Sequence, residues 1–185
     1  MRLIAITKEH FFDGEAEMLQ TLLGQGFWRI HLRKPQAGAE ALEAFLQQIP
    51  PRFYHAISLH DHFATAARLK LGGVHLNSRN PTPPEGWTGL VSRSCHSIDE
   101  IARHAPRCDY MFLSPIFDSI SKPGYRSAFN LDQLQQSGML SDKVFALGGV
   151  TPQRLPQLEA AGFGGAAMLG SAWASHPDSH ITASQ

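Results

Sequence analysis

The sequence lacks the features that would mark a secreted or membrane protein. Among its 185 residues there are only two cysteines, Cys95 and Cys108, too few for a disulfide framework. The apolar run near the N-terminus is far shorter than the core of a signal peptide, and no run approaches membrane-spanning length. From these absences we expect a cytoplasmic protein in a reducing compartment, with no membrane partner.

The chain also lacks an excess of one charge, since 16 Lys and Arg residues balance 16 Asp and Glu residues. A nucleic-acid partner or an anionic membrane surface would call for a basic surplus, so the composition argues against both. No GxGxxG sequence follows the first apolar segment, which argues against a dinucleotide-binding fold. The length is that of one ordinary domain with a substantial core.

What the sequence does contain is an alternation of short apolar runs, typical of strands, with amphipathic segments, typical of helices. The predicted strands are Leu3–Thr7, Trp28–Leu32, Tyr54–Leu59, Val74–Leu76, Leu90–Ser94, Tyr110–Leu113, Val144–Leu147 and Gly165–Leu169. The predicted helices are Glu15–Gln25, Ala39–Ile49, His62–Leu71, Ser97–Ala105, Leu131–Gln136 and one capped by Thr151, with a short turn at Ser171–Ala174. Pro156 lies inside the helix that follows Thr151 and is expected to shorten or bend it.

Eight strands, nearly all followed by a helix, predict a parallel α/β fold, and their number favours a closed (β/α)₈ barrel over an open sheet. No helical pattern follows Val74–Leu76, where the Pro-rich connector Asn80–Gly86 stands instead. We therefore expect a single compact barrel whose fourth helix is short or missing. Residues 1–175 are assigned to the barrel and residues 176–185 to a polar tail.

In such a barrel the functional site lies at the carboxyl ends of the strands. Polar and ionisable groups follow most of the predicted strands, and their convergence on one face predicts a binding site for an anionic small molecule. These residues are His31, Arg33 and Lys34; His60, Asp61 and His62; His75, Asn77, Arg79 and Asn80; Ser94, Cys95 and His96; Ser119, Ser121 and Lys122; Gly148 and Gly149; and Leu169 and Gly170.

Two other kinds of site can be drawn from these residues. Cys95 and His96 could form a nucleophilic dyad, but neighbours in a strand point to opposite faces, so we expect Cys95 to be buried. The spacing of His60 and His62 is that of barrel metal hydrolases, and a metal site could also use His31, His75 and His96. The lack of an acidic ligand near the last strand argues against it, and His75 is more typical of a packed, hydrogen-bonded histidine.

Seven stretches together resemble the thiamine phosphate synthase/TenI superfamily, a (β/α)₈ group, over nearly the whole chain. They are LIAIT, IHLRK, SLHDHFATAARLKLGGVHLNSRN, SRSCHSIDEI, DYMFLSPIFDSISK, FALGGVTPQRL and EAAGFGGAAMLGSA. The Pro-Ile-Phe…Ser-Lys and Ala-Leu-Gly-Gly pieces, in this order and at this spacing, are the most specific.

The synthase of this superfamily joins a pyrimidine pyrophosphate to a thiazole phosphate, using Mg²⁺ and releasing pyrophosphate. The resemblance implies that the thiazole phosphate is held by Ser119, Ser121, Gly148, Gly149, Leu169 and Gly170. It further implies that Arg33, Ser94 and Lys122 face the pyrophosphate and that Asp61 is a magnesium ligand, with Asn80 as a second.

The chain departs from the synthase on the pyrophosphate side. His31 and His60 stand where the synthase has Gln and Asn, and Pro35 stands where it has Lys, although Lys34 adjoins. Asn80 replaces an acidic magnesium ligand, and an amide brings no charge to the metal.

TenI, the sister branch, is a thiazole tautomerase that isomerises a thiazole carboxylate phosphate by proton transfer without a metal. The pieces IHLR, NSR and SCHS resemble TenI more than the synthase. This resemblance makes His96 the acid/base group, a role that suits imidazole near neutral pH, with Arg33 and Lys122 as further catalytic candidates and His31 and His60 as substrate contacts.

We therefore expect a tautomerase that needs no cofactor. The alternatives are a Mg²⁺-dependent synthase and a non-catalytic member that binds thiazole phosphate or thiamine phosphate. Compact members of the superfamily often form dimers, so a homodimer is a further expectation.

Overall fold

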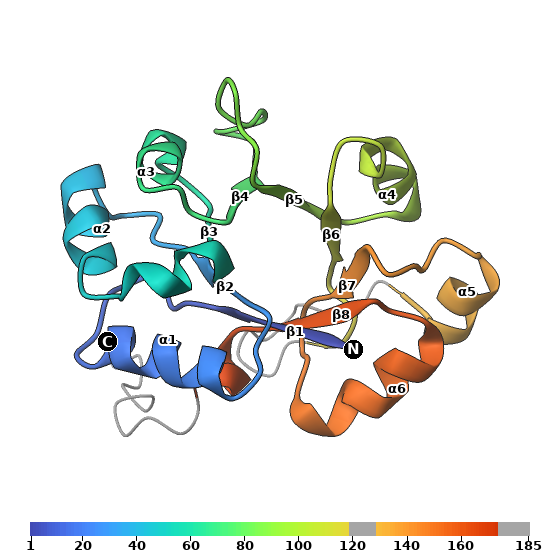
Figure 1. The fold of residues 1–185 in the computed structure, drawn as a ribbon. Helices are drawn as coiled ribbons and strands as arrows, with labels where there is room; N and C mark the ends of the chain where they lie inside the picture. The colour runs from blue at the N-terminus through green and yellow to red at the C-terminus, as the bar shows by residue number, and fades with distance from the viewer. Residues whose placement is uncertain (119–128, 174–185) are drawn as a thin grey trace, which may run out of the picture.

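The computed structural model describes residues 1–118 and 129–173 and shows a closed barrel of eight parallel strands (Figure 1). Neighbouring strands pair in sequence order, and β1 pairs with β8 to close the barrel. The strands are β1 (Arg2–Ile6), β2 (Arg29–Leu32), β3 (Ile57–Leu59), β4 (Gly73–Leu76), β5 (Leu90–Cys95), β6 (Tyr110–Leu113), β7 (Val144–Ala146) and β8 (Gly165–Met168). The predicted barrel is confirmed.

The helices lie outside the ring of strands, as Figure 1 shows. They are α1 (Glu15–Gly24), α2 (Ala39–Leu46), α3 (Phe63–Arg68), α4 (Ile98–His104), α5 (Leu131–Gln136) and α6 (Leu155–Ala161), with 3₁₀ turns at Pro51–Ala56, Pro152–Arg154 and Gly170–Ala172. Residues 77–89, between β4 and β5, contain no helix, so the missing fourth helix is confirmed. No helix in the described part of the chain is long and apolar enough to cross a membrane.

Two local predictions were wrong, both at prolines. The predicted strand Tyr54–Leu59 is shorter, because Pro51 starts a 3₁₀ turn that runs to Ala56 and leaves three residues to β3. The Thr151 side chain makes no capping hydrogen bond, and a 3₁₀ turn at Pro152 precedes α6. Pro156 therefore lies in the first turn of α6, where its missing N–H leaves no hydrogen bond unmade.

The inside of the barrel has an apolar part and a polar part. Side chains of β1, β6, β7 and β8 form the apolar part, a buried cluster of Ile4, Ile6, Tyr110, Phe112, Phe145 and Ala167. Strands β2 to β5 instead contribute the buried polar side chains Arg29, His31, Ser58, His75 and Ser92. The candidates that follow β2 to β5 lie above and among the polar group, and those that follow β7 and β8 lie above the apolar group.

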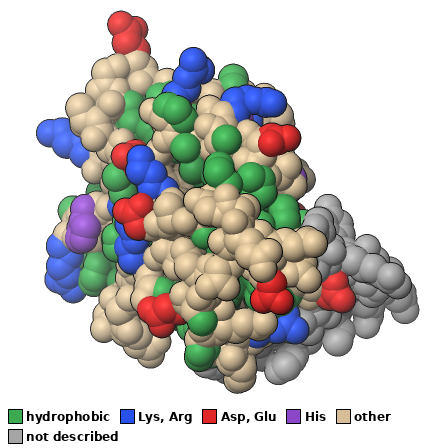
Figure 2. Space-filling view, turned by 90° about the vertical axis from the view of Figure 1, so that its right-hand side faces the viewer, with side chains coloured by type: hydrophobic (Ala, Val, Ile, Leu, Met, Phe, Trp, Pro, Cys, Tyr) green, Lys and Arg blue, Asp and Glu red, His purple; other side chains and the backbone are tan. Residues whose placement is uncertain are grey.

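The outer surface agrees with the balanced composition. On the face shown in Figure 2, basic and acidic side chains are interspersed and apolar side chains occur between them. This face therefore has no broad area of a single charge. The predicted tail at residues 176–185, and the boundary at residue 175, lie outside the described residues.

Candidate active site

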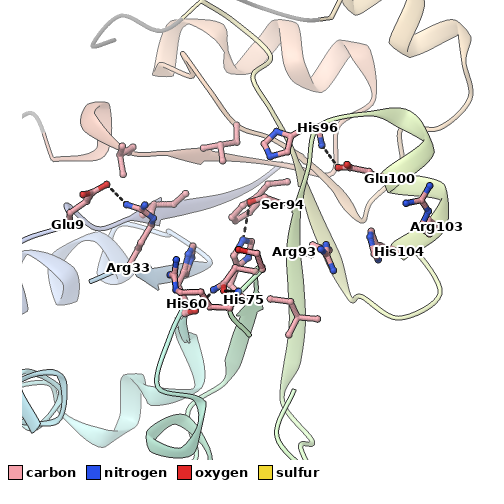
Figure 3. A pocket seen from close by; sticks show the side chains of 18 residues that line it. Glu9, Arg33, His60, His75, Arg93, Ser94, His96, Glu100, Arg103 and His104 are labelled. Atoms are coloured by element: carbon pink, nitrogen blue, oxygen red, sulfur yellow. Dashed lines mark hydrogen bonds and ion pairs between the residues drawn. The ribbon is translucent and has the colours of Figure 1, made fainter. Parts of the chain in front are cut away.

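A cavity of about 640 Å³ lies at the carboxyl ends of the strands (Figure 3). Eight residues of the predicted strand-end group line it, namely Arg33, His60, His75, Asn77, Arg79, Ser94, His96 and Leu169. They lie near or just after the carboxyl ends of β2, β3, β4, β5 and β8, so residues far apart in the sequence meet at one site. Convergence at this end of the barrel is what the strand-end pattern predicted.

His96 stands at the mouth of this cavity, directly after β5, in a defined orientation. Its Nδ1 lies 3.1 Å from the carbonyl oxygen of Ser114. A carbonyl can only accept a hydrogen bond, so this contact places the proton of the neutral ring on Nδ1 and leaves Nε2 as a proton acceptor.

The start of α4 fixes the backbone of His96. Ser97 caps the helix, and its Oγ accepts from the N–H of Glu100 at 3.2 Å. The carboxylate of Glu100 reaches back to the N–H of His96 at 2.7 Å. This is a capping box in which the Glu100 carboxylate binds the N–H one residue before the cap, and it anchors the backbone of His96 at the mouth of the cavity.

Arg33 is held at the opposite side of the cavity by local contacts. Its Nη1 donates to Oε1 of Glu9 at 2.5 Å, and its N–H donates to Oγ1 of Thr7 at 2.9 Å. The Arg33 side chain is 40% exposed and that of Glu9 48%, so this ion pair is solvated and adds little stability. The guanidinium is therefore able to exchange this partner for an anionic ligand.

Ser94 connects the cavity to the polar interior. Its Oγ lies 3.0 Å from Nε2 of His75, whose Nδ1 lies 2.9 Å from Oγ of Ser92. His75 is buried and hydrogen-bonded through both ring nitrogens, which confirms the packed role predicted for it. Burial, with smaller effects of Arg93 and Arg33, lowers the pKa of His75 to about 3, so the ring is neutral at physiological pH.

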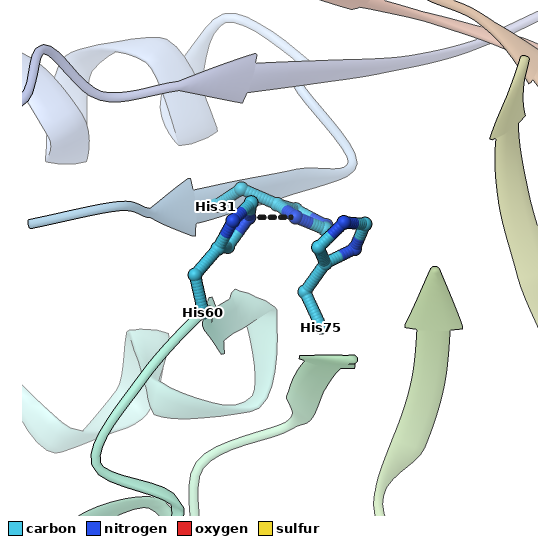
Figure 4. Close-up of side chains that lie close together, drawn as sticks. All are labelled: His31, His60 and His75. Carbon is cyan, nitrogen blue, oxygen red and sulfur yellow. Dashed lines mark hydrogen bonds between the residues drawn. The ribbon is translucent and has the colours of Figure 1, made fainter. Parts of the chain in front are cut away.

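A hydrogen-bonded chain descends from His60 into the barrel. Nε2 of His60 lies 2.9 Å from Nδ1 of His31, and Nε2 of His31 lies 2.6 Å from the hydroxyl of Tyr110 (Figure 4). His31 is fully buried and does not line the cavity, whereas His60 does. Burial lowers the pKa of both histidines well below the usual value, and neighbouring histidine rings add to the effect. The expectation of a substrate contact is therefore better met by His60 than by His31.

Asp61, the predicted magnesium ligand, is engaged by a guanidinium. Nη2 of Arg79 lies 2.8 Å from Oδ1 and 3.1 Å from Oδ2 of Asp61, and Nε lies 3.2 Å from Oδ1. The amide nitrogen of Asn80 also donates to Oδ1 at 3.1 Å. Mg²⁺ prefers oxygen ligands, at least one of them an unpaired carboxylate. Here the Asp61 carboxylate is already paired with the Arg79 guanidinium, and Asn80 presents its NH₂ group rather than its oxygen. The described residues in this arrangement do not fit a resident Mg²⁺.

The ends of β7 and β8 offer backbone donors for a phosphate. Gly148 and Gly149 have φ of 95° and 61°, and a Cβ at Gly149 would lie 2.5 Å from the carbonyl oxygen of Asp118. Within the described part of the chain, the N–H groups of Gly148, Gly149, Leu169 and Gly170 donate to no acceptor. Because β7 and β8 are neighbours, these N–H groups lie near one another, a pattern typical of phosphate sites in such barrels.

Three residues from the predicted strand-end group have other roles. Lys34 is buried, and its Nζ lies 2.7 Å from each carboxylate oxygen of Glu15, so it does not replace the missing lysine at Pro35. His62 faces the carbonyl oxygen of Ala37 at 2.8 Å. Cys95 is fully buried, which raises the pKa of its thiol to about 12, so the expected burial is confirmed and a Cys95–His96 dyad is excluded.

Some residues of the cavity were missed by the sequence analysis. Glu9 follows β1, and its place after a strand end could have identified it. Arg93 lies between Ser92 and Ser94 on β5, and both serines face the barrel interior, so Arg93 points outward. Arg93, Arg103 and His104 line the cavity where no helix follows β4, and no local sequence pattern predicts their place in it.

Three predicted site residues, Ser119, Ser121 and Lys122, lie outside the described residues.

Comparisons with known proteins agree on one family. The family described as "Thiamine monophosphate synthase" matches residues 3–172. A thiamine-phosphate synthase of Synechococcus sp. strain CC9605 is 33% identical over 68% of the chain, and a putative thiamine-phosphate synthase of Geobacter sulfurreducens is 27% identical over 95%. The chain spans 38% of the Synechococcus protein and 88% of the Geobacter protein. It also spans 57% of a Latilactobacillus sakei relative.

A solved structure extends the similarity to three dimensions. The thiamine phosphate pyrophosphorylase of Bacteroides thetaiotaomicron is 34% identical, covers 100% of this chain and is itself covered over 90%, with a TM-score of 0.86. A 3-hexulose-6-phosphate synthase at 16% identity, with a TM-score of 0.61, shares the fold alone. The whole chain is therefore similar, in sequence and in fold, to one solved structure.

Proposed function

Because the chain belongs to the thiamine monophosphate synthase family, we propose that it is an enzyme of thiamine biosynthesis that acts on a phosphorylated thiazole. Within that role, we propose that it isomerises a thiazole carboxylate phosphate by proton transfer. The observation that carries this proposal is the orientation of His96. Its Nδ1–H is committed to the Ser114 carbonyl oxygen, which leaves Nε2 as a base at the mouth of the cavity.

A tautomerisation moves one proton between two atoms of the same molecule, so a single group can take it up and return it. Nε2 of His96 accepts the proton from the substrate, and the ring becomes an imidazolium. The Ser114 carbonyl oxygen then accepts a stronger hydrogen bond from Nδ1–H, which stabilises the cation. Nε2 returns the proton at the second position, and no proton is gained or lost overall.

The cavity and the adjoining ends of β7 and β8 supply groups for positioning. The N–H groups at the ends of β7 and β8 are suited to the substrate phosphate. Arg33, across the cavity from His96, is suited to the carboxylate, because a guanidinium can bind a carboxylate through two parallel hydrogen bonds. Ser94 and His60 offer a hydroxyl and an imidazole to the ring between these charged ends.

The synthase reaction is the second candidate, and the names of the related proteins favour it. The pairing of Asp61 with Arg79 argues for the reaction that needs no magnesium, since synthase activity would first require that ion pair to open. Magnesium dependence therefore separates the two activities.

The test of the proton carrier is the variant His96→Gln, assayed with thiazole carboxylate phosphate. We expect kcat to fall by about 10²–10⁴-fold, the usual contribution of general acid–base catalysis, while KM changes little. The control is His55→Gln, an exposed histidine whose Nδ1 contacts the Arg52 carbonyl oxygen away from the cavity. A His96→Gln enzyme with undiminished kcat would exclude His96 as the proton carrier.

The competing functions are tested with pyrimidine pyrophosphate and thiazole phosphate, with and without Mg²⁺. Magnesium-dependent formation of thiamine phosphate would establish the synthase in place of the tautomerase. Binding of thiazole phosphate without turnover in either assay would establish a non-catalytic binding protein.

A further inference from the structure

Three buried histidines lie side by side at the cavity, two lining it and one below them, and the mechanism above leaves two of the three without a role. His31, His60 and His75 each offer a ring nitrogen, and these nitrogens all lie within 4.8 Å of one another (Figure 4). We propose that they form a binding site for one transition-metal ion of the Zn²⁺ class, with an open coordination position facing the cavity.

The strand register explains why these residues meet. In the pairing of β2 with β3, His31 lies beside Ser58, and in the pairing of β3 with β4, Ser58 lies beside Gly73. His60, directly after β3, and His75 on β4 each follow two residues later, and their side chains point to the same face as those of Ser58 and Gly73, because side chains alternate along an extended chain. The two rings stack with their centroids 4.2 Å apart, so the barrel itself holds the histidines together.

In both His31 and His75, the ring nitrogen that does not face the metal has a hydrogen-bond partner. If Nδ1 of His31 binds the metal, Nε2–H donates to the Tyr110 hydroxyl, which lies 2.6 Å away. If Nε2 of His75 binds the metal, Nδ1–H donates to Oγ of Ser92, which lies 2.9 Å away. Metal-binding histidines commonly make this kind of contact, because it fixes the tautomer and the direction of the lone pair.

The spacing is close to that of a metal site. Bonds of about 2.0–2.1 Å to a tetrahedral Zn²⁺ place two ligand nitrogens about 3.3 Å apart. The nitrogens of His31 and His60 are 2.9 Å apart and share one proton in a hydrogen bond, so a metal ion would replace that proton, with a small turn of the two rings and an approach of the His75 ring. In that movement Nε2 of His75 exchanges the Ser94 hydroxyl for the metal, which releases Ser94 to the cavity.

The type of ligand decides the type of ion. Three imidazole nitrogens without a carboxylate favour Zn²⁺, Co²⁺, Ni²⁺ or Cu²⁺ over Mg²⁺, which prefers oxygen. A neutral imidazole is the form that binds a metal, and all three rings are buried. Arg33 and Arg79 repel a cation at His60, but each is paired with a carboxylate, Glu9 and Asp61 respectively.

The fourth coordination position of the metal would be open to the cavity. His60 and His75 line the cavity, while His31 lies below them, so a fourth ligand reaches the metal from the cavity side. Three protein ligands and one exchangeable position are typical of catalytic rather than structural zinc sites. A carboxylate-bearing or phosphorylated small molecule in the cavity would be within reach of that position.

The first experiment is a calorimetric titration of the metal-free protein with Zn²⁺. We expect one equivalent to bind per chain, and we expect His60→Gln and His75→Gln each to weaken binding by at least about 100-fold, since even partners of a metal ligand change affinity by about 10–100-fold. The matched control is His104→Gln, because His104 lines the same cavity outside the cluster and its loss should leave Zn²⁺ affinity within a factor of about two.

A second measurement does not depend on the stability of the variants. X-ray absorption of the Zn²⁺-loaded wild-type protein should show three imidazole nitrogens at about 2.0 Å. A Co²⁺-loaded sample should show the intense visible bands of a tetrahedral ion. Absence of stoichiometric binding, fewer than three imidazole ligands, or full binding by His60→Gln and His75→Gln would each overturn the proposal.

Discussion

The two halves of the barrel interior differ in the side chains that fill them and in the groups at their strand ends. Strands β6, β7, β8 and β1 fill their half with the apolar side chains of the inner cluster, and the carboxyl ends of β7 and β8 present backbone N–H groups. Strands β2 to β5 fill theirs with hydrogen-bonded histidine, serine and arginine side chains, and their ends present side-chain groups. Backbone N–H groups are present in the first half whatever its side chains are, whereas the chemistry of the second half depends on residue identity.

This difference explains where the chain departs from the synthase that it resembles. The His31 and His60 differences and the Asn80 difference all fall on the side-chain half. Replacing a polar interior residue there requires new hydrogen-bond partners, and His31 has them in Tyr110 and His60. The glycine pair at the end of β7 is retained, because φ of 61° and a neighbouring carbonyl oxygen leave no room for a Cβ at Gly149. The following predictions test the comparison of the two halves, from the largest expected effect to the smallest.

Acid should act on the histidine half first. The pKa of His31, His60 and His75 lies below that of an unfolded histidine, about 6.5, so below that pH the unfolded chain binds protons that the folded chain does not. The free energy of unfolding of the metal-free protein should therefore fall as pH falls, by about 2 kcal/mol at pH 5 for His75, whose pKa is lowered to about 3, and further through His31 and His60. Urea denaturation from pH 8 to pH 5 measures it. A free energy that stays constant over this range would contradict the neutral, buried state.

The apolar half should be the more sensitive to loss of volume. Phe145 is fully buried in the inner cluster, and Phe145→Ala should lower the free energy of unfolding by about 3–5 kcal/mol through the cavity that it leaves. The control is Phe11→Ala, since Phe11 is 37% exposed and should cost less than half as much. Urea denaturation at pH 8 compares them, and equal losses would show that the inner cluster is not tightly packed.

Affinity for thiazole phosphate at the ends of β7 and β8 should fall when a Cβ is added at Gly149, and it should change little when the Leu169 side chain is shortened. Gly149→Ala forces a Cβ against the Asp118 carbonyl oxygen and strains the backbone by about 1–3 kcal/mol, so thiazole phosphate affinity should fall about tenfold or more. Leu169→Ala removes a 43% exposed side chain and leaves the N–H groups in place, so its affinity should change less than about threefold. Calorimetry measures both, and the reverse order would place the phosphate on side chains.

The smallest effect is expected from a single hydroxyl. Tyr110→Phe removes the partner of Nε2 of His31 and should lower the free energy of unfolding by about 1 kcal/mol. Tyr54→Phe is the control, because that hydroxyl contacts the Leu46 carbonyl oxygen at a part-buried site and should cost less. If Tyr110→Phe leaves the free energy of unfolding unchanged, the hydrogen bond between His31 and the Tyr110 hydroxyl does not stabilise the protein.

The sequence by itself determined the barrel and the face that carries function. The period of apolar residues marks strands and helices locally, and closure of eight parallel strands then places every strand end on one side, so Arg33, Ser94 and His96 could be assigned to one site before their contacts were known. The boundaries at Tyr54 and Thr151 were missed, because prolines begin 3₁₀ turns that share the local pattern of strands and helices.

Only the tertiary structure decided which polar side chains face the cavity and which face each other. Lys34 and Arg33 are adjacent in sequence, yet one is buried against Glu15 and the other reaches the cavity, because alternate residues beyond a strand end leave on opposite faces. The pairing of Asp61 with Arg79 and the meeting of His31, His60 and His75 depend on register between strands. Register is a property of neighbouring strands, and no single stretch of sequence contains it.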